Sequence, residues 1–510
     1  MAVHFYVLIA AATAAVAVYQ YFLRQSQYWR RRNVPGPDSP LFFGNIREIS
    51  KLDDPTPLKI HEWTKKYGKV YGFKEGVRNV LVISDIEMMN EVFSKQFDNF
   101  YSRREPLIVG DLDNEPRVNL FESRGSRWKR LRALSSPSFS IGSLKKILPI
   151  VEDSAVKLVE LMGAKHDGGA SFNIHQYFSE YTLDTISRLV MGQKESTLFE
   201  NPRIDTLRSI FLFRFDRFIF YLAAAIPAVG KVLRVILRAS SLSSSSRSVF
   251  TEMEETVAER MEQRKKSGPP AIPADFIDLF LESESDFDYA NRGQFSTLDS
   301  VTKALTVDEV ICQAFVFLLA GFDTTSNALA FTAWMLSRHP EVMKKCQEEI
   351  DDVCREGSIS YEDCQNLRYL DAVCRETLRF YPLGAKAITR TCMNDTVVGG
   401  YAIEKGTTVI GDSFAIHLDK KLWGEDASEF RPERWLESEK RVAAINFLSF
   451  GAGPRVCIGM RLAMMEEKIA LAHLLRRFDI LPDEKISELK LMGSTTITPE
   501  TVPVKIRSRA

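Results

Sequence analysis

The chain holds seven cysteines, and one of them, Cys457, stands in a setting that suits metal chemistry. Residues 450–459 read Phe-Gly-Ala-Gly-Pro-Arg-Val-Cys-Ile-Gly, and a helical pattern over residues 460–476 follows directly. A thiol just before a helix start lies at the positive end of the helix dipole, and flanking glycines free amide N–H groups to point at the sulfur. The pattern favours a metal-binding thiolate; the alternative is an inert buried cysteine in a glycine- and proline-rich loop.

A second group of reactive side chains falls in the middle of a long apolar stretch. Residues 306–309 read Thr-Val-Asp-Glu, which is the spacing of a capping box, and the pattern predicts a helix over residues 306–339. Gly321, Asp323 and Thr324 interrupt its apolar centre. Glycine weakens a helix interior and a buried aspartate is costly unless it is paired, so this centre is a candidate site.

With four further motifs, these residues resemble the cytochrome P450 superfamily. Residues 450–459 match its haem-binding loop, F-x-x-G-x-R-x-C-x-G, and residues 320–325 resemble its oxygen-activating motif. The motifs stand in the family's order and cover essentially the whole chain after an apolar N-terminal segment. The nearest likeness is to animal microsomal members of the drug- and xenobiotic-oxidising group. The further motifs are Trp128 to Arg132, the E-x-x-R pair of Glu376 and Arg379, the P-E-R segment at residues 430–435 and the proline-rich residues 34–37.

The resemblance implies the roles of the central residues. Cys457 is expected to ligate the iron of heme b as an axial thiolate, which favours cleavage of the O–O bond of O2. Thr324 and Asp323 are expected to deliver protons to the bound oxygen, and Gly321 to make room for it. The alternative for Thr324 is a hydroxyl that hydrogen bonds back to its own helix.

The resemblance also implies residues that hold the cofactor and the loop beneath it. An arginine or histidine often follows the E-x-x-R pair in this family, and here Lys386 or Arg390 is the candidate for the last propionate. Glutamate and arginine three residues apart share one helix face, which suits a buried ion network. The remaining cofactor-binding residues are Trp128, Arg132, Arg455 and Phe450. The expected ion network consists of Glu376, Arg379 and Arg434.

The N-terminus has the pattern of a membrane anchor. Residues 3–23 carry no Asp, Glu, Lys or Arg, and a basic cluster around Trp29 follows. This length matches one bilayer span of roughly 20 residues, with the positive charge on the cytosolic side. We expect an uncleaved single-pass anchor at residues 1–24, with the catalytic domain facing the cytosol from the endoplasmic reticulum membrane; a surface helix or cleaved signal peptide is the alternative. Residues 25–37 are expected to form a hinge, and residues 38–510 one catalytic domain.

The composition excludes several classes of protein. Lys+Arg and Asp+Glu both total 67, so no basic excess indicates nucleic acid as a partner. The odd number of cysteines and the lack of a C-x-x-C pair exclude a disulfide scaffold or structural zinc site. Helical patterns dominate residues 126–350, whereas residues 69–84 and 396–410 contain strand patterns. The sequence thus predicts a mainly α fold with a minor β portion, the cytochrome P450 fold, in which residues 240–248 form an exposed connection.

Several segments are expected to surround the substrate. Residues 210–222 are dense in phenylalanine and are expected to form one helix, either in the core or as a pocket roof that dips into the membrane. Residues 104–121, 383–388 and 492–496 are expected to complete the pocket. A lone histidine such as His417 is expected to be a structural hydrogen bonder and not an iron ligand.

The resemblance implies a monooxygenase that inserts one oxygen atom into apolar xenobiotics, lipids, fatty acids or steroids. The chain has no glycine-rich phosphate loop after a strand, so NADPH is expected to act through a separate flavoprotein reductase, with cytochrome b5 as an optional second donor. Lys129, Arg130 and Arg461 are expected to steer an acidic reductase surface. Two alternatives remain: a haem-thiolate isomerase or peroxide-rearranging enzyme, whose relatives tend to lack the acid–alcohol pair, and a haem- or lipid-binding carrier or sensor.

Overall fold

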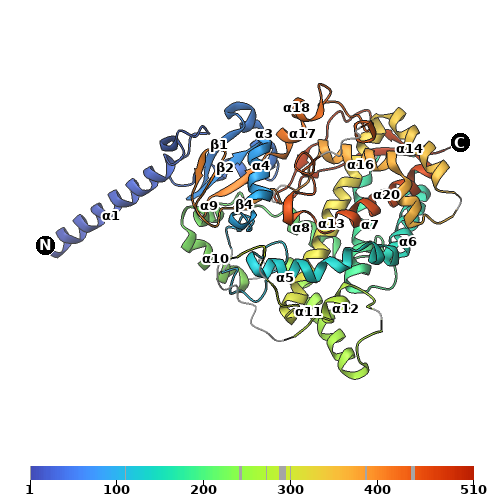
Figure 1. The fold of residues 1–510 in the computed structure, drawn as a ribbon, viewed down its shortest axis with the longest axis horizontal. Coiled ribbons are helices and arrows are strands. Elements are labelled where there is room, and N and C mark those ends of the chain that lie inside the picture. Colours follow the sequence, from blue (N-terminus) through green and yellow to red (C-terminus); the bar gives the residue numbers. More distant parts are fainter. Residues whose placement is uncertain are drawn as a thin grey trace.

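A computed structural model describes residues 2–108, 111–239, 244–271, 273–285, 295–298, 300–355, 357–384, 387–437 and 443–509. In this part of the chain the fold is mainly helical with small sheets, as predicted (Figure 1). The helices are α1 (Ala2–Ser26), α2 (Ile46–Ile49), α3 (Thr56–Tyr67), α4 (Ile86–Asn90), α5 (Gly125–Ser135), α6 (Ile141–His166), α7 (Ile174–Met191), α8 (Ile204–Phe211), α9 (Phe218–Ala225), α10 (Pro227–Ala239), α11 (Ser244–Ser267), α12 (Phe276–Leu281), α13 (Val307–Arg338), α14 (Pro340–Val353), α15 (Tyr361–Asn366), α16 (Arg368–Phe380), α17 (Ser413–His417), α18 (Lys420–Trp423), α19 (Arg434–Glu437) and α20 (Met460–Arg477).

The strands form a sheet near the N-terminus and smaller sheets elsewhere. The larger sheet has the order β1-β2-β7-β4, in which only the β2–β7 pair is parallel. A second sheet, of order β3-β11-β8, joins the C-terminal strands to the start of α7. The strands are β1 (Val70–Glu75), β2 (Arg78–Ile83), β3 (Phe172–Asn173), β4 (Thr389–Thr391), β5 (Thr396–Val398), β6 (Tyr401–Ile403), β7 (Thr408–Gly411), β8 (Phe478–Pro482), β9 (Leu491–Met492), β10 (Thr498–Pro499) and β11 (Pro503–Ser508).

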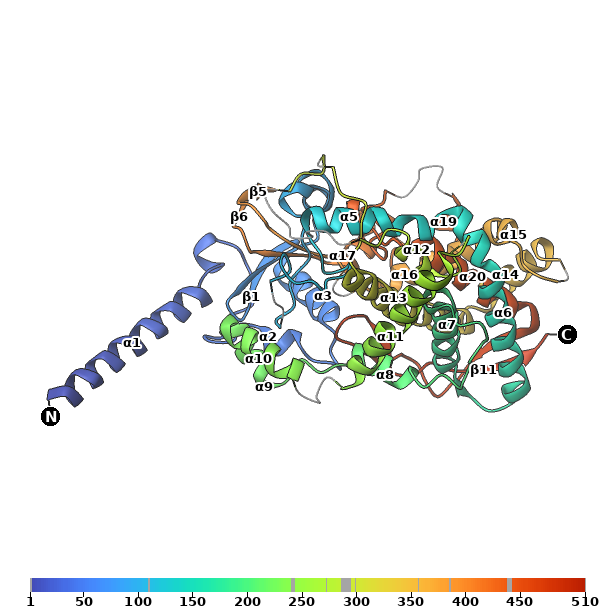
Figure 2. The same cartoon turned by 90° about the horizontal axis from the view of Figure 1, so that it is seen from below.

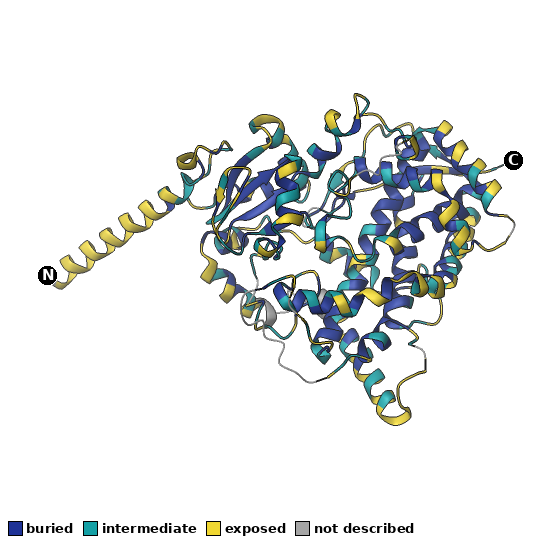
Figure 3. Cartoon of the chain, in the orientation of Figure 1, coloured by how far each residue is buried: buried dark blue, intermediate teal, exposed yellow. Residues whose placement is uncertain are grey.

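The central helix α13 confirms the prediction for residues 306–339. Both hydrogen bonds of the capping box are present: the Glu309 amide donates to the Thr306 hydroxyl, and the Thr306 amide donates to the Glu309 carboxylate, each at 3.2 Å. Because this helix is apolar on every side, it is buried, and α7 packs along it (Figure 3). Among the described residues it is one of two helices long and apolar enough to span a membrane; the other is α1, which is exposed along most of its length.

Residues 25–37, which the sequence predicts to be a hinge, are docked on the first sheet. The Trp29 indole is buried and its Nε1 donates to the carbonyl of Phe73 at 2.8 Å. The amide of Gly72 donates to the Pro35 carbonyl at 2.8 Å, and a Cβ at Gly72 would overlap the Trp29 ring. Proline stiffness indicated a turn but could not reveal that the segment has a binding surface on β1.

Polar contacts fix the same segment at two more points. The buried Nζ of Lys74 donates to the Gln25 side chain at the end of α1, at 2.8 Å. Glu404 accepts from the Tyr28 hydroxyl at 2.8 Å and forms an ion pair with Arg32. Helix α1 therefore joins the sheet through a defined set of contacts (Figure 1).

The phenylalanine-rich residues 210–222 are not one helix, so that prediction is wrong. Helix α8 ends at Phe211, α9 begins at Phe218, and residues 212–217 are irregular. Arg214 pairs with Asp216 at 2.6 Å within this break. The charged residues that interrupt the phenylalanines mark the break, and the rings of Phe213, Phe215 and Phe220 cluster across it. Of residues 240–248, which were expected to form an exposed connection, residues 244–248 belong to α11, and residues 240–243 lie outside the described residues.

Candidate active site

The loop of residues 450–459 places Cys457 at the wall of a cavity of about 250 Å³. The Cys457 amide donates to the Phe450 carbonyl at 2.8 Å, which closes the loop. Gly453 has a positive φ of 67°, and a Cβ there would overlap the carbonyl oxygen of Phe93, so only glycine fits. The cysteines at the other six positions are buried, whereas the Cys457 thiol is open to the cavity.

Two opposing effects act on the Cys457 thiol. Burial in the protein interior raises the pKa of this thiol. Amide N–H groups of Gly459 and Met460, at the start of α20, and the charges of Arg132 and Arg103 lower it. These positive groups are the ones that would favour a thiolate once the sulfur binds a metal.

The cavity brings together most of the residues predicted to bind the cofactor. Helix α5 contributes two of them, and the cysteine loop contributes the other three. Helix α13 adds Gly321 and Thr324, which the resemblance implies act on oxygen. Leu120, Phe121, Leu383, Gly384 and Ala387 also line it, in agreement with the predicted pocket segments. Residues 492–496 do not line this cavity, and their part in the substrate pocket stays a prediction. The predicted cofactor residues that line it are Cys457, Trp128, Arg132, Arg455 and Phe450.

An arginine cluster borders the cavity beside the cysteine. Arg455 donates from Nε to the carbonyl of Tyr101 at 2.7 Å, and Arg132 donates to the carbonyl of Val456 at 2.7 Å. Burial, followed by the charges of Arg103, Arg390 and Arg132, lowers the pKa of Arg455 well below its usual range. In the described part of the chain, these four arginines make no ion pair with a carboxylate.

The cluster fits a flat group that carries two carboxylates. Arg455 Nη1, Arg103 Nε and Arg390 Nε are buried and have no hydrogen-bond partner among the described residues. Such groups are costly to bury unless an anion meets them, and haem brings two propionates. Lys386, the other candidate for the last propionate, lies outside the described residues. Arg103 was missed because its neighbour Arg104, which pairs with Glu75, looks the same in the sequence.

The acid and alcohol of the central helix point in different directions. Thr324 lines the cavity, and its hydroxyl donates to the carbonyl of Ala320 at 2.7 Å, which is the alternative that the sequence left open. Asp323 is buried away from the cavity, where it accepts hydrogen bonds from Thr496 at 2.5 Å and from Asn327 at 3.0 Å. The pair is adjacent in sequence but its two polar groups do not contact each other.

Gly321 is explained by the packing of α7 on α13. A Cβ at this position would lie 2.7 Å from the Cδ1 atom of Ile186, closer than side chains approach. The glycine therefore lets the two helices approach at the cavity wall. A role for Gly321 in admitting dioxygen stays a prediction.

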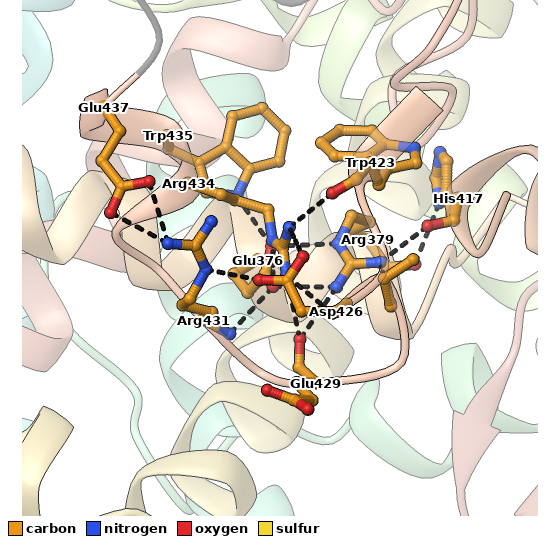
Figure 4. Close-up of polar contacts among 11 residues, drawn as sticks. Glu376, Arg379, His417, Trp423, Asp426, Glu429, Arg431, Arg434, Trp435 and Glu437 are labelled. Carbon is orange, nitrogen blue, oxygen red and sulfur yellow. Dashed lines mark hydrogen bonds and ion pairs between the residues drawn. The ribbon is translucent and has the colours of Figure 1, made fainter. Parts of the chain in front are cut away.

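The predicted ion network is present and fully buried (Figure 4). Arg379 donates to both oxygens of Glu376, at 2.8 and 3.0 Å, and Arg434 Nε donates to Glu376 at 2.8 Å. The indole of Trp435, which the sequence did not single out, donates to Glu376 at 2.9 Å. Further bonds from Arg379 reach the carbonyl groups of His417 and Ala427, both at 2.6 Å.

A second buried ion network joins α5 to α13. Glu309 is fully buried and accepts from Arg127 Nε at 2.8 Å and from Arg130 Nη2 at 2.7 Å. Arg130 is therefore not on the surface, which corrects its predicted role in steering a reductase. Lys129 is partly exposed and Arg461 is exposed. A helix pattern cannot distinguish a solvated arginine from one whose partner lies far away in the chain.

Two adjacent carboxyl groups on α20 also line the cavity. Glu466 and Glu467 are buried, and one oxygen of each has no hydrogen-bond partner among the described residues. Burial raises the pKa of Glu466 well above its usual range and raises that of Glu467 to about 8. Burial therefore disfavours the charged form of both carboxyl groups. Neither residue could be singled out from the sequence, because paired glutamates on a helix are usually solvated.

His417 is a structural hydrogen bonder, as predicted. Its Nδ1 lies 3.0 Å from the Arg379 carbonyl, to which it donates, while Nε2 accepts from the Leu448 amide at 2.8 Å. Burial lowers the pKa of His417 to about 3. The neutral imidazole thus links the ion network to the chain segment that leads into the cysteine loop.

We expect His417 to make the protein sensitive to acid. Below about pH 6.5 the unfolded chain binds a proton here and the folded protein does not, so stability falls with falling pH down to about pH 3. The free energy of unfolding should fall between pH 7 and pH 5 in the wild type. In His417→Gln, which keeps one donor and one acceptor, this fall should be about 2 kcal/mol smaller, as measured by chemical unfolding at both pH values. Equal losses in the two proteins would contradict this assignment.

A mainly helical protein that presents a cysteine thiol and clustered arginines to one apolar cavity has the architecture of a haem-thiolate protein. A family model described as Cytochrome P450 matches residues 34–506. The chain belongs to the cytochrome P450 family. Members of this family are haem-thiolate oxidoreductases, which use O2 as monooxygenases.

Several relatives from Caenorhabditis elegans are named as cytochromes P450. Cytochrome P450 cyp-13B1 is 43% identical over 503 residues, which covers 96% of this chain and 97% of that protein. CYP13A3 is 41% identical over 514 residues, covering 98% and 99%. CYP13A10 is 41% identical over 516 residues, covering 99% of both chains. The likeness extends over the N-terminal helix as well as the catalytic body.

Proposed function

We propose that this protein is a membrane-anchored monooxygenase that inserts one oxygen atom of O2 into apolar organic molecules. The observation that carries the proposal is the Cys457 thiol, which faces an apolar cavity beside buried arginine N–H groups that lack partners. Xenobiotics, lipids, fatty acids and steroids are the substrate classes that suit such a cavity.

The residues of the chain would divide the work in the following way. When bound, haem supplies the redox chemistry that activates O2. Cys457 would ligate its iron as a thiolate, and Arg103, Arg132 and Arg455 would bind its propionates by charge-assisted hydrogen bonds. Thr324 of α13 lines the cavity, and its hydroxyl would deliver protons into the cavity.

The exposed apolar surface supports delivery of substrates from a membrane. Phe218 of α9 is 61% exposed and Val235 of α10 is 67% exposed, although both are apolar. The Phe43 ring contacts Phe218, and the neighbouring Phe42 contacts Phe22 of α1, so apolar rings connect α1 to α9. Helices α9 and α10 lie on the side of the molecule where α1 joins it (Figure 2). A surface of this kind suits contact with lipid, here the endoplasmic reticulum membrane, with the catalytic body in the cytosol.

Electrons would reach the iron from NADPH through a separate flavoprotein reductase, with cytochrome b5 as an optional second donor. Lys129 and Arg461 remain candidates to steer its acidic surface, whereas the buried Arg130 does not. The variant Arg461→Glu should be reduced more slowly by the reductase. Recovery of the rate at low ionic strength, when an acidic residue of the reductase is changed to a basic one, would support docking on this side.

The first test of the proposed function is the reduced carbon-monoxide difference spectrum of the haem-loaded protein. We expect a strongly red-shifted Soret band that disappears in Cys457→Ala, because only thiolate ligation gives this shift. Cys392→Ala is the matched control, since this cysteine is buried far from the cavity loop in sequence. A folded, haem-loaded wild-type protein with an unshifted band would overturn the proposal.

A further inference from the structure

We propose that Thr496 is a positioning residue for Asp323: its hydroxyl holds the carboxyl outside the cavity and sets the pH range over which that carboxyl exchanges protons. Thr496 lies in the loop between β9 and β10, near the C-terminus, and it is buried. The inference rests on the proposed function, because it concerns the acid that recharges Thr324 during oxygen reduction.

Two side chains donate hydrogen bonds to the same carboxylate oxygen of Asp323. Thr496 Oγ1 donates to Asp323 Oδ2 at 2.5 Å, and Asn327 Nδ2 donates to that oxygen at 3.0 Å. Asn327 also donates to Thr498 at 3.1 Å, so Thr498 reaches the carboxyl only through Asn327. All four side chains are buried, which strengthens each bond and makes the direction of the carboxyl well defined.

The charges around Asp323 give the direction of the effect. Burial raises the pKa of Asp323 to about 6, while the bonds from Thr496 and Asn327 and the charge of Arg208 on α8 act against this increase. On α7, His175 faces Asn327, and its own pKa is lowered to about 4 by burial and then by Arg208. Removing the Thr496 hydroxyl takes away a donor that favours the carboxylate, so Asp323 should keep its proton to higher pH.

The loop that carries Thr496 is fixed to the cavity wall. The amide of Ile497, the next residue, donates to the carbonyl of Leu383 at 3.0 Å, and Leu383 lines the cavity. Gly493 has a φ of 128°, and its amide donates to the carbonyl of Leu52 at 2.8 Å. The hydroxyl is therefore placed by a segment that contacts both the substrate cavity and the acid.

The test is a pH titration of the Asp323 carboxyl by infrared difference spectroscopy on the haem-loaded protein, which needs no substrate. Asp323→Asn identifies the carboxyl band. In Thr496→Val we expect the titration midpoint to rise by about one pH unit, since one hydrogen bond to the charged form is lost. Thr496→Ala removes the same hydroxyl with less risk to packing and should give the same shift.

Two variants control for effects on packing. Thr496→Ser keeps the hydroxyl and should titrate like the wild type, and Thr498→Val should as well, because Thr498 bonds only Asn327. Unchanged midpoints in both Thr496→Val and Thr496→Ala, or an equal shift in Thr498→Val, would overturn the inference. Reductase-supported NADPH oxidation and peroxide release, measured in parallel, test the proposed function separately: their absence in wild type would overturn that function while the titration still reports on Thr496.

Discussion

Replacement of Glu376 by alanine is expected to destabilise the folded protein by about 3–5 kcal/mol and to abolish haem retention. The carboxylate is fully buried and pairs with Arg379 and Arg434, so its removal leaves the buried Arg379 without its counter-ion and Arg434 with only the more distant Asp426 carboxylate, at 3.3 Å. Arg379 also donates to the carbonyl of His417, and the His417 Nε2 accepts from the amide of Leu448, two residues before the cysteine loop. Loss of the network should therefore reach Cys457.

Haem content per protein and chemical unfolding monitored by circular dichroism would measure both effects. The matched control is Glu437→Ala, because Glu437 pairs with Arg431 at the edge of the same cluster but is 57% exposed. We expect this control to change stability by less than about 1 kcal/mol. A Glu376→Ala protein with full haem content and an unchanged unfolding midpoint would refute the structural role of the network.

A comparable effect is expected for Glu309→Ala. Its carboxylate bonds Arg127 and Arg130 of α5 and accepts the Thr306 amide at the start of α13. The change removes a counter-ion shared by two buried arginines, for which we expect a loss of about 3–5 kcal/mol. Since α5 also carries cavity residues, haem affinity should decrease in the variants that still fold.

The neighbouring residue Asp308 offers the control for this prediction. Asp308 is 37% exposed and pairs with Arg117, which is 45% exposed, in the same helical turn as Glu309. Thermal unfolding of Asp308→Ala should show a loss of less than about 1 kcal/mol. Similar losses in Glu309→Ala and Asp308→Ala would mean that burial of the ion pair is not what matters here.

The sequence was most informative where the responsible interactions are local. The capping box at Thr306 and the apolar residues after it were sufficient to predict α13, because helix caps and helix periodicity involve residues three or four positions apart. The glycines around Cys457 indicated a loop whose backbone can come close to a bound group. Glu376 and Arg379 are three residues apart and share one helix face. The resemblance to the cytochromes P450 extended these local patterns to the mainly α fold, and the comparisons confirm it.

Contacts between distant parts of the chain could not be predicted in this way. Arg130 and its partner Glu309 are 179 residues apart, and Asp323 and Thr496 are 173 residues apart. Because the sequence does not reveal these partners, Arg130 was predicted to be a surface charge, and the direction of the Asp323 side chain could not be predicted. The same limit explains why Arg103 was not distinguished from its neighbours.

The docking of residues 25–37 on the first sheet has a consequence for the proposed membrane anchor. Helix α1 has 25 residues, so it is about 37 Å long, whereas a bilayer's hydrocarbon core is about 30 Å thick. A spanning helix adapts to such a mismatch by tilting. Because contacts of Trp29 and Gln25 fix the end of α1 to β1, the proposed anchoring predicts that a change in bilayer thickness would rotate the whole catalytic body and change the depth of α9 and α10.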